Sequence, residues 1–186
     1  MSTSFDAIVI GTGQAGPALA ARLAGAGQKV AIVERHRFGG TCVNDGCTPT
    51  KTLIASAYAA HIAARAADYG VQIDGKPRVD MQRVKARKDA VVANSSQNVE
   101  NWMRGLKGAA VFRGHARFVG KNTVKVNDEE LTAKTIFIVL EHDEIWFGIH
   151  GTRGYLAFCF PHLVLGPPKK RSSVFCIAES ISHQGA

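Results

Sequence analysis

The sequence has no long hydrophobic run. No segment of the 186 residues approaches the roughly 18 consecutive apolar residues that a membrane-spanning helix needs, and the N-terminus lacks a basic region followed by an apolar signal segment. Neither membrane insertion nor secretion is therefore expected. The sequence predicts a cytoplasmic location.

Cysteine is scarce as well, with only four in the chain. So few cysteines in a cytoplasmic protein argue against a disulfide scaffold and favour thiol chemistry at one pair, Cys42 and Cys47. A metal site at this pair would require two further Cys or His ligands, and the nearby histidines form no such pattern. No metal is expected, and Cys159 and Cys176 are predicted to be ordinary thiols.

Acidic residues are fewer than basic ones, which gives a formal net charge of +8. The whole excess of basic residues lies in the first 140 positions, where they are scattered except for a cluster formed by Arg83, Lys85, Arg87 and Lys88. A nucleic-acid binder would show a steeply salt-dependent affinity. Attraction of an anionic cofactor, or a solvated helix face, explains the charge as well, so nucleic acid is not the expected partner.

The first 34 residues have the pattern of a βαβ unit. Residues 5–10 form a short apolar run typical of a strand, residues 11–16 are a glycine-rich turn, and residues 17–26 are rich in Ala and Leu, as in a helix. Residues 29–34 are a second apolar strand. The sequence therefore predicts an α/β fold with a parallel sheet.

The glycine-rich turn, GTGQAG, follows the logic of a dinucleotide-binding loop. Gly11 would make the tight turn, Gly13 would let backbone approach a pyrophosphate, and Gly16 would let helix and strand pack closely. Glu34, at the end of the second strand, could accept hydrogen bonds from ribose hydroxyls. Together with its flanking strand and helix, the loop predicts a dinucleotide site rather than a merely structural turn.

Two longer helices are predicted downstream, over residues 48–67 and 80–106. Asp80 is a candidate N-cap for the second helix, and Gly105 or Gly108 a candidate terminator. The predicted apolar side of this helix carries Met81, Val84, Val91, Val92, Val99 and Trp102.

Residues 110–131 have the pattern of a β-meander. Strands are predicted over 111–118 and 123–126, with turns at residues 120–122 and 127–128. A further buried strand is predicted over 135–140.

The spacing of Cys42 and Cys47 constrains the backbone between them. In a regular α-helix, Cα atoms five residues apart are separated by roughly 8 to 9 Å, whereas a disulfide tolerates only about 4.4 to 6.8 Å. If the two cysteines pair, the intervening backbone must leave helical geometry, and Gly46 is the residue best able to permit this. Such a bridge would be reducible. Two inert thiols, or half of a metal site, are the alternatives.

Three of these features together carry a family resemblance: GTGQAG, Glu34, and the segment GGTCVNDGCTPTK over residues 39–51. They resemble the N-terminal FAD-binding region of the class I flavin-dependent pyridine nucleotide-disulfide oxidoreductases, which include dihydrolipoyl dehydrogenase, glutathione reductase and mercuric reductase. Residues 87–92 and 114–118 are similar to the mercuric reductase and dihydrolipoyl dehydrogenase branches. The resemblance covers about residues 5–138 and implies a Rossmann-like FAD-binding domain.

By this resemblance, Cys47 would be the thiol that lies next to the flavin and Cys42 the thiol that attacks the substrate. Lys51 would lie near the reactive edge of the flavin ring, the alternative being a solvated helix lysine. His115 is expected to act through its backbone as a strand residue rather than as a base. The implied FAD site comprises Gly11, Gly13, Gln14, Ala15, Gly16, Glu34, Gly40, Thr41, Cys42, Gly46, Cys47, Lys51, His115 and Ala116.

The sequence also departs from the family pattern. Asp45 stands where the family usually has an apolar residue, and Thr48 and Thr50 replace the common Ile and Ser. After Ile138 the expected Thr-Gly dipeptide is missing, and neither a second glycine loop for NAD(P)H nor a C-terminal dimerisation domain follows.

We therefore expect an incomplete FAD-binding domain over residues 1–140 and an irregular, non-family tail over residues 141–186. The tail is hypothesised to be disordered or to arise from a frameshift, which sequencing of the coding DNA would test. In the full family, electrons pass from NAD(P)H through FAD and the Cys42–Cys47 disulfide to a thiol, disulfide or mercuric-ion substrate, in a homodimer that serves cell redox homeostasis. Little NAD(P)H-dependent turnover is expected of this chain. The alternative is a non-catalytic nucleotide-binding or redox-sensing module.

Overall fold

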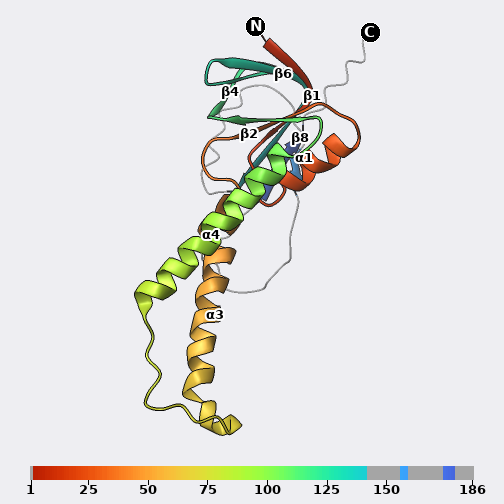
Figure 1. The fold of residues 1–186 in the computed structure, drawn as a ribbon. Helices are drawn as coiled ribbons and strands as arrows, with labels where there is room; N and C mark the ends of the chain where they lie inside the picture. Colours follow the sequence, from red (N-terminus) through yellow and green to blue (C-terminus); the bar gives the residue numbers. More distant parts are fainter. Residues whose placement is uncertain (1, 142–155, 159–173, 179–186) are drawn as a thin grey trace, which may run out of the picture.

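A parallel sheet forms the centre of the molecule (Figure 1). The computed structural model describes residues 2–141, 156–158 and 174–178. Strand β1 (Ser2–Ile10) pairs in parallel with β2 (Val30–Glu34) on one side and with β6 (Glu129–Glu141) on the other, and β2 pairs with β3 (Ala109–Arg113). The predicted βαβ unit is therefore confirmed, with helix α1 (Gly16–Gly25) connecting β1 and β2.

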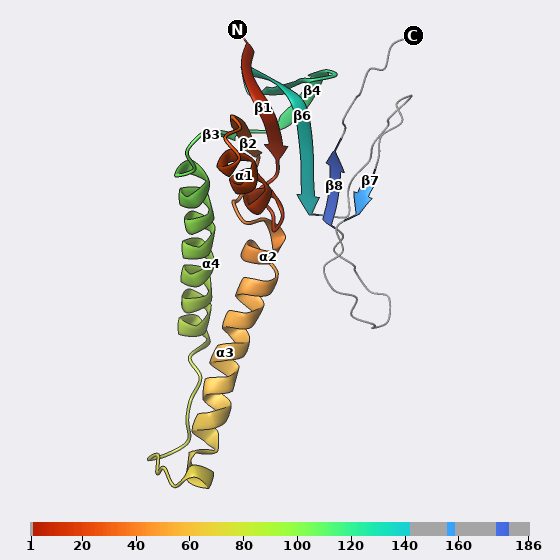
Figure 2. The ribbon, with the colours of Figure 1, turned by 90° about the vertical axis from the view of Figure 1, so that its right-hand side faces the viewer.

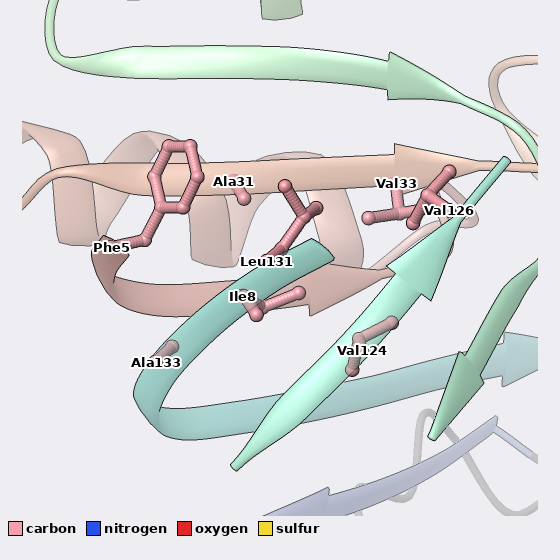
Figure 3. Packing of buried hydrophobic residues seen from close by; sticks show 8 residues of the cluster. All are labelled: Phe5, Ile8, Ala31, Val33, Val124, Val126, Leu131 and Ala133. Atoms are coloured by element: carbon pink, nitrogen blue, oxygen red, sulfur yellow. The ribbon is translucent and has the colours of Figure 1, made fainter. Parts of the chain in front are cut away.

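The strands of this sheet bury side chains on both faces. Along β1, Ile8 and Val9 are both fully buried but belong to different hydrophobic clusters, because successive side chains of a strand point to opposite faces. One cluster lies on the side of the helices and includes Val9, Ala20, Val30, Ile32, Phe38, Met103 and Val139. The other, shown in Figure 3, comprises Phe5, Ile8, Ala31, Val33, Val124, Val126, Leu131 and Ala133. Burial on both faces explains why these strands read as continuous apolar runs.

A small antiparallel meander completes the second cluster. Strands β4 (Ala116–Gly120), β5 (Thr123–Val126) and the first part of β6 pair antiparallel in sequence order. The meander is as predicted, but the single strand over residues 111–118 is wrong. The chain leaves β3 after Arg113 and enters β4 at Ala116, because β3 pairs in parallel with β2 whereas β4 pairs antiparallel with β5.

Helix α4 (Met81–Arg104) has the predicted caps. The side chain of Asp80 accepts hydrogen bonds from the backbone N–H groups of Gln82 and Arg83, at 2.9 and 3.1 Å, and Gly105 is the C-cap. The predicted apolar face is partly wrong, since Met81 and Trp102 are exposed. Met103 is fully buried in the core instead.

Helices α3 (Cys47–Ala64) and α4 form an antiparallel hairpin that extends away from the sheet (Figures 1 and 2). A short 3₁₀ helix, η1 (Ala66–Tyr69), follows α3. The Arg87 guanidinium links the two helices by donating hydrogen bonds to the carbonyl oxygen of Thr52 and the hydroxyl of Ser56, at 3.0 and 3.2 Å.

Two short strands beyond residue 141 are described, β7 (Leu156–Phe158) and β8 (Val174–Ala178). Strand β8 pairs antiparallel with the end of β6 and with β7, so it lies beside the sheet (Figure 2). Sequence periodicity did not predict either strand. The other residues of the predicted tail lie outside the described residues, and the domain boundary at residue 140 stays a prediction.

Candidate functional site

The glycine-rich turn connects the end of β1 to the start of α1. Gly11 has a φ of 103°, which favours glycine, and its N–H donates to the carbonyl oxygen of Val33 at 2.8 Å. A Cβ on Gly16 would lie 2.1 Å from the carbonyl oxygen of Gly11, so a side chain at this position would collide with the turn. The tight turn and the close packing predicted for these two glycines are both present.

Glu34 lies beside this turn at the end of β2, and 8% of the residue is exposed. One carboxylate oxygen accepts hydrogen bonds from the backbone N–H of Thr12, at 2.9 Å, and from its hydroxyl, at 2.6 Å. The other oxygen accepts from the N–H of His36 at 2.8 Å. These three donors hold the carboxylate in a fixed position. Because a carboxylate has about four acceptor sites, it keeps capacity for a ligand hydroxyl.

A cavity of about 550 Å³ lies in front of the turn and Glu34. Its volume falls within the range of about 300 to 1,000 Å³ that is typical of small-molecule sites. Seven of the predicted site residues line it: Gly11, Gly13, Glu34, Gly40, Thr41, His115 and Ala116. The remaining predicted residues are not among those described as lining it: Gln14, Ala15, Gly16, Cys42, Gly46, Cys47 and Lys51.

The two cysteines flank a break between helices at the edge of this cavity. Cys42 lies within the short helix α2 (Gly40–Asn44) and Cys47 is the first residue of α3. Between the helices, the N–H groups of Asp45 and Gly46 both donate to the carbonyl oxygen of Thr41, at 2.9 and 2.7 Å. The backbone between the cysteines therefore leaves helical geometry, as pairing would require.

The surroundings of the two thiols differ. Cys42 is half-buried, whereas Cys47 is an exposed free thiol, and Lys51 is exposed one turn further along α3. A Cβ on Gly46 would lie 3.1 Å from the carbonyl oxygen of Thr41, so the turn is packed closely against the end of α2. The Cys42–Cys47 disulfide and the role of Lys51 stay predictions.

Basic side chains gather at the cavity. Arg35, His36 and Arg37 follow Glu34 directly, are exposed and line the cavity. Arg37 forms an ion pair of 2.6 Å with Asp45, which joins the end of β2 to the turn between the cysteines. The remaining basic groups are suited to attract an anionic ligand.

Sequence reasoning missed several residues that line the cavity: Thr12, Arg35, His36, Arg37, Asn44, Asp45 and Gly114. Thr12 could have been found from its place inside the glycine-rich turn. The proximity of Gly114 follows from the parallel pairing of β3 with β2, which brings their carboxyl ends together. Asn44 carried no signal that distinguishes it from an ordinary helix residue.

This arrangement fits FAD. The glycine-rich turn excludes side chains where a pyrophosphate would approach, and Glu34 is fixed where a ribose would lie. FAD would be held by Gly11, Gly13, Glu34, Gly40, Thr41, His115 and Ala116.

Comparison with known proteins decides the family. The profile described as pyridine nucleotide-disulphide oxidoreductase matches residues 5–156. The chain belongs to this family. Members of the pyridine nucleotide-disulphide oxidoreductase family are FAD-dependent flavoproteins with NAD(P)H as co-substrate, and the family is homodimeric. The resemblance read from the three sequence motifs is thereby confirmed.

Individual relatives agree with this assignment. The dihydrolipoyl dehydrogenase of Acholeplasma laidlawii is 35% identical over 138 residues, which are 74% of this chain and 41% of that protein. The dihydrolipoyl dehydrogenase of Thermus scotoductus is 38% identical over 135 residues, which are 73% of this chain and 29% of that protein. The chain therefore spans well under half the length of these relatives.

A solved structure shares the fold. The Cu(II) complex of the HOCl-induced flavoprotein disulfide reductase RclA from Escherichia coli matches with a TM-score of 0.61 and 30% identity, over 80% of this chain and 31% of that protein. This similarity confirms the Rossmann-like α/β fold that the sequence predicted.

Two features are absent from the described part of the chain. No helix there is long and apolar enough to cross a bilayer. Nor do three or more His, Cys, Asp or Glu side chains come together there as a set of metal ligands.

Proposed function

We propose that this chain binds FAD in the cavity between the glycine-rich turn, Glu34 and the start of α2, and that Cys42 and Cys47 form a redox-active pair beside it. The observation that carries the proposal is the convergence of three elements on one cavity. The turn supplies Gly11 and Gly13, the end of β2 supplies Glu34, and α2, which contains Cys42, supplies Gly40 and Thr41.

Each of these groups has a role in the proposed site. Backbone N–H groups of the turn and the N-terminus of α1 provide partial positive charge for the pyrophosphate. Glu34 accepts hydrogen bonds from the ribose, and Thr12 keeps its carboxylate in place. His115 and Ala116 also line the cavity. Bound FAD would supply the chemistry of accepting a hydride and passing two electrons on.

The cysteines are proposed to hold those two electrons. In the oxidised form a bond joins the two sulfur atoms. Two electrons and two protons break this bond and give two thiols, and Cys42 then exchanges with an oxidised thiol or disulfide substrate. A mercuric-ion substrate, by contrast, would bind to the two thiols of the reduced pair. Cys47 is exposed and Cys42 is partly exposed, so a substrate can approach the pair from the solvent.

In the whole family reaction, NAD(P)H supplies the electrons. We propose this reaction for a protein of the length of the relatives, working as a homodimer.

The visible spectrum of the purified chain, after incubation with FAD and gel filtration, tests the proposal. Retained flavin absorption in the blue, with close to one FAD per chain, supports it. A colourless chain that still binds ADP would instead indicate the nucleotide-binding or redox-sensing module. A chain that binds neither compound would contradict both functions.

A further inference from the structure

An ion pair on the lining of the cavity lies beside the proposed redox pair. The guanidinium of Arg37 and the carboxylate of Asp45 are 2.6 Å apart, and both residues line the cavity. Asp45 lies between Cys42 and Cys47 in the sequence, at the position where the family usually has an apolar residue. The FAD site described above uses neither member of this ion pair.

The turn between α2 and α3 holds Asp45 close to both cysteines. Asp45 is the C-cap of α2, and its N–H donates to the carbonyl oxygen of Thr41 at 2.9 Å, which is the helical hydrogen-bond pattern. Residues three apart in such a turn are neighbours, with Cβ atoms about 5 to 6 Å apart, so Asp45 lies beside Cys42. Two residues of chain reach at most about 7 Å, which limits the distance between the Cα atoms of Asp45 and Cys47. One negative charge therefore lies near both thiols.

The ion pair does little for the stability of the fold. The side chains of Arg37 and Asp45 are 45% and 59% exposed, and ion pairs in such surroundings contribute little to stability. The main effect is on the local charge, because Arg37 offsets a carboxylate that would otherwise stand alone next to the cysteines. Charges interact through water over about 10 Å at about 0.1 M salt, so a charged substrate at Cys42 is within range of this ion pair.

The proposed exchange reaction produces negative charge at this place. The Cys42 thiolate attacks a substrate disulfide, a mixed disulfide forms, and one substrate thiolate leaves. Cys47 then attacks the Cys42 sulfur of the mixed disulfide, the Cys42–Cys47 bond forms, and the second substrate thiolate leaves. The two cysteines have then given up two protons and two electrons. Both leaving groups are anions that form beside Asp45.

We propose that Arg37 is a specificity-determining residue: by offsetting the charge of Asp45, it allows the cysteine pair to react with disulfides that carry negative charge. An unpaired Asp45 would repel such substrates, and an unpaired Arg37 would attract them. This inference rests on the proposed function, because it requires that the pair exchanges with a disulfide substrate.

The test measures how fast the reduced chain reacts with two aromatic disulfides, one that carries two carboxylates and a neutral dipyridyl disulfide. The quantity compared is the ratio of the anionic to the neutral rate, because a change in thiol ionisation or in access to the thiols alters both rates. Every protein in the series carries Cys159→Ser and Cys176→Ser, which leave Cys42 and Cys47 as the thiols of the chain.

Arg37→Gln should lower this ratio about threefold at low ionic strength, and Asp45→Asn should raise it by a similar factor. The double variant, which removes both charges, should return the ratio to the wild-type value. Arg37→Lys keeps the charge and should also match wild type. Salt at about 1 M should abolish the differences, since it shortens the range of charge interactions to about 3 Å.

The matched control is Arg65→Gln. Arg65 forms an ion pair of 2.9 Å with Asp68, and the two side chains are 49% and 59% exposed, so this variant makes the same change in net charge in a similar environment. Arg65 directly follows the 18 residues of α3, which places it about 27 Å along the helix from Cys47. The ratio of Arg65→Gln should equal that of wild type.

Equal ratios in wild type and Arg37→Gln would overturn the inference while leaving the proposed function intact. Equal losses in Arg37→Gln and Arg65→Gln would also overturn it, because the net charge of the whole chain would then be the cause. A wild-type chain that releases only one reagent thiol, with a lasting mixed disulfide on Cys47, would contradict the redox pair itself and would overturn both.

Discussion

Thr12 donates two hydrogen bonds to a single oxygen of Glu34, one from its backbone N–H at 2.9 Å and one from its hydroxyl at 2.6 Å. Both residues are buried. The interaction joins the glycine-rich turn to the end of the neighbouring strand, so the pyrophosphate end and the ribose end of the proposed site are positioned relative to each other before any ligand binds.

Replacing Thr12 by Val should destabilise the chain, because the side chain keeps its shape but loses the donor to a buried carboxylate. The expected loss in the free energy of unfolding is about 1.5 to 3 kcal/mol, the usual worth of a hydrogen bond to a charged group. Urea denaturation without FAD measures it. Thr12→Ser keeps the hydroxyl and should lose less, so equal losses in the two variants would contradict this account.

Replacing Gly16 by Ala should damage both folding and FAD binding. The added Cβ would lie 2.1 Å from the carbonyl oxygen of Gly11, and relieving that contact requires α1 or the turn to move. Overpacking of this kind typically costs about 1 to 3 kcal/mol, which thermal unfolding would reveal as a lowered Tm.

The matched control lies at the other end of the same helix. A Cβ on Gly25 meets nothing within 4 Å, so Gly25→Ala should leave the Tm unchanged or raise it, since alanine favours the helix by about 1 kcal/mol over glycine. If both variants lose the same stability, the close approach at Gly16 is not the cause.

Short-range sequence patterns predicted the local features of the site, but they did not predict contacts between residues far apart in the sequence. The glycine-rich turn and the acid at the end of β2 are encoded within stretches of a few residues, and both were predicted. The short helix α2 was not predicted, and a non-helical backbone between the cysteines was expected only on the condition that they pair. The division of residues 111–118 into β3 and β4 was not predicted, because it depends on the pairing of β3 with β2 and of β4 with β5. Local periodicity contains no information on which strands will pair.

The core shows the same limit. Met103 is fully buried whereas Met81 is 65% exposed, although both are apolar residues of α4. The far end of the hairpin extends beyond the sheet, so only the C-terminal part of α4 has a sheet to pack against (Figure 2). Helical spacing assigns residues to faces but does not show where along the helix its packing partner ends.

Oxidation of the purified chain should join Cys42 and Cys47. The helix break between them removes the separation that a continuous helix would impose. Mild oxidation with diamide, followed by alkylation and peptide mass analysis, should find both cysteines protected and linked to each other.

Two variants make this test specific. Cys47→Ser should leave Cys42 open to alkylation after the same treatment, whereas Cys159→Ser should leave the Cys42–Cys47 link unchanged. A wild-type chain in which Cys47 links instead to Cys159 or Cys176 would contradict the assignment of the redox pair.

Stability should also depend on pH through Glu100. The hydrogen bonds from Arg113 and then from Arg104 hold the pKa of this carboxyl below its ordinary value of 4.5. A depressed pKa in the folded state means that the ionised group stabilises the fold above pH 4.5, and that this contribution is lost as the pH falls through the lower folded-state value.

Glu100→Gln should therefore be less stable than wild type at neutral pH, and the difference should shrink on acidification. Glu129→Gln, an exposed carboxylate at the start of β6, is the control, and the urea midpoint of each variant between neutral and acid pH gives the comparison. A Glu100→Gln difference that stays constant down to the acid end would show that the two arginines do not act through the charge of Glu100.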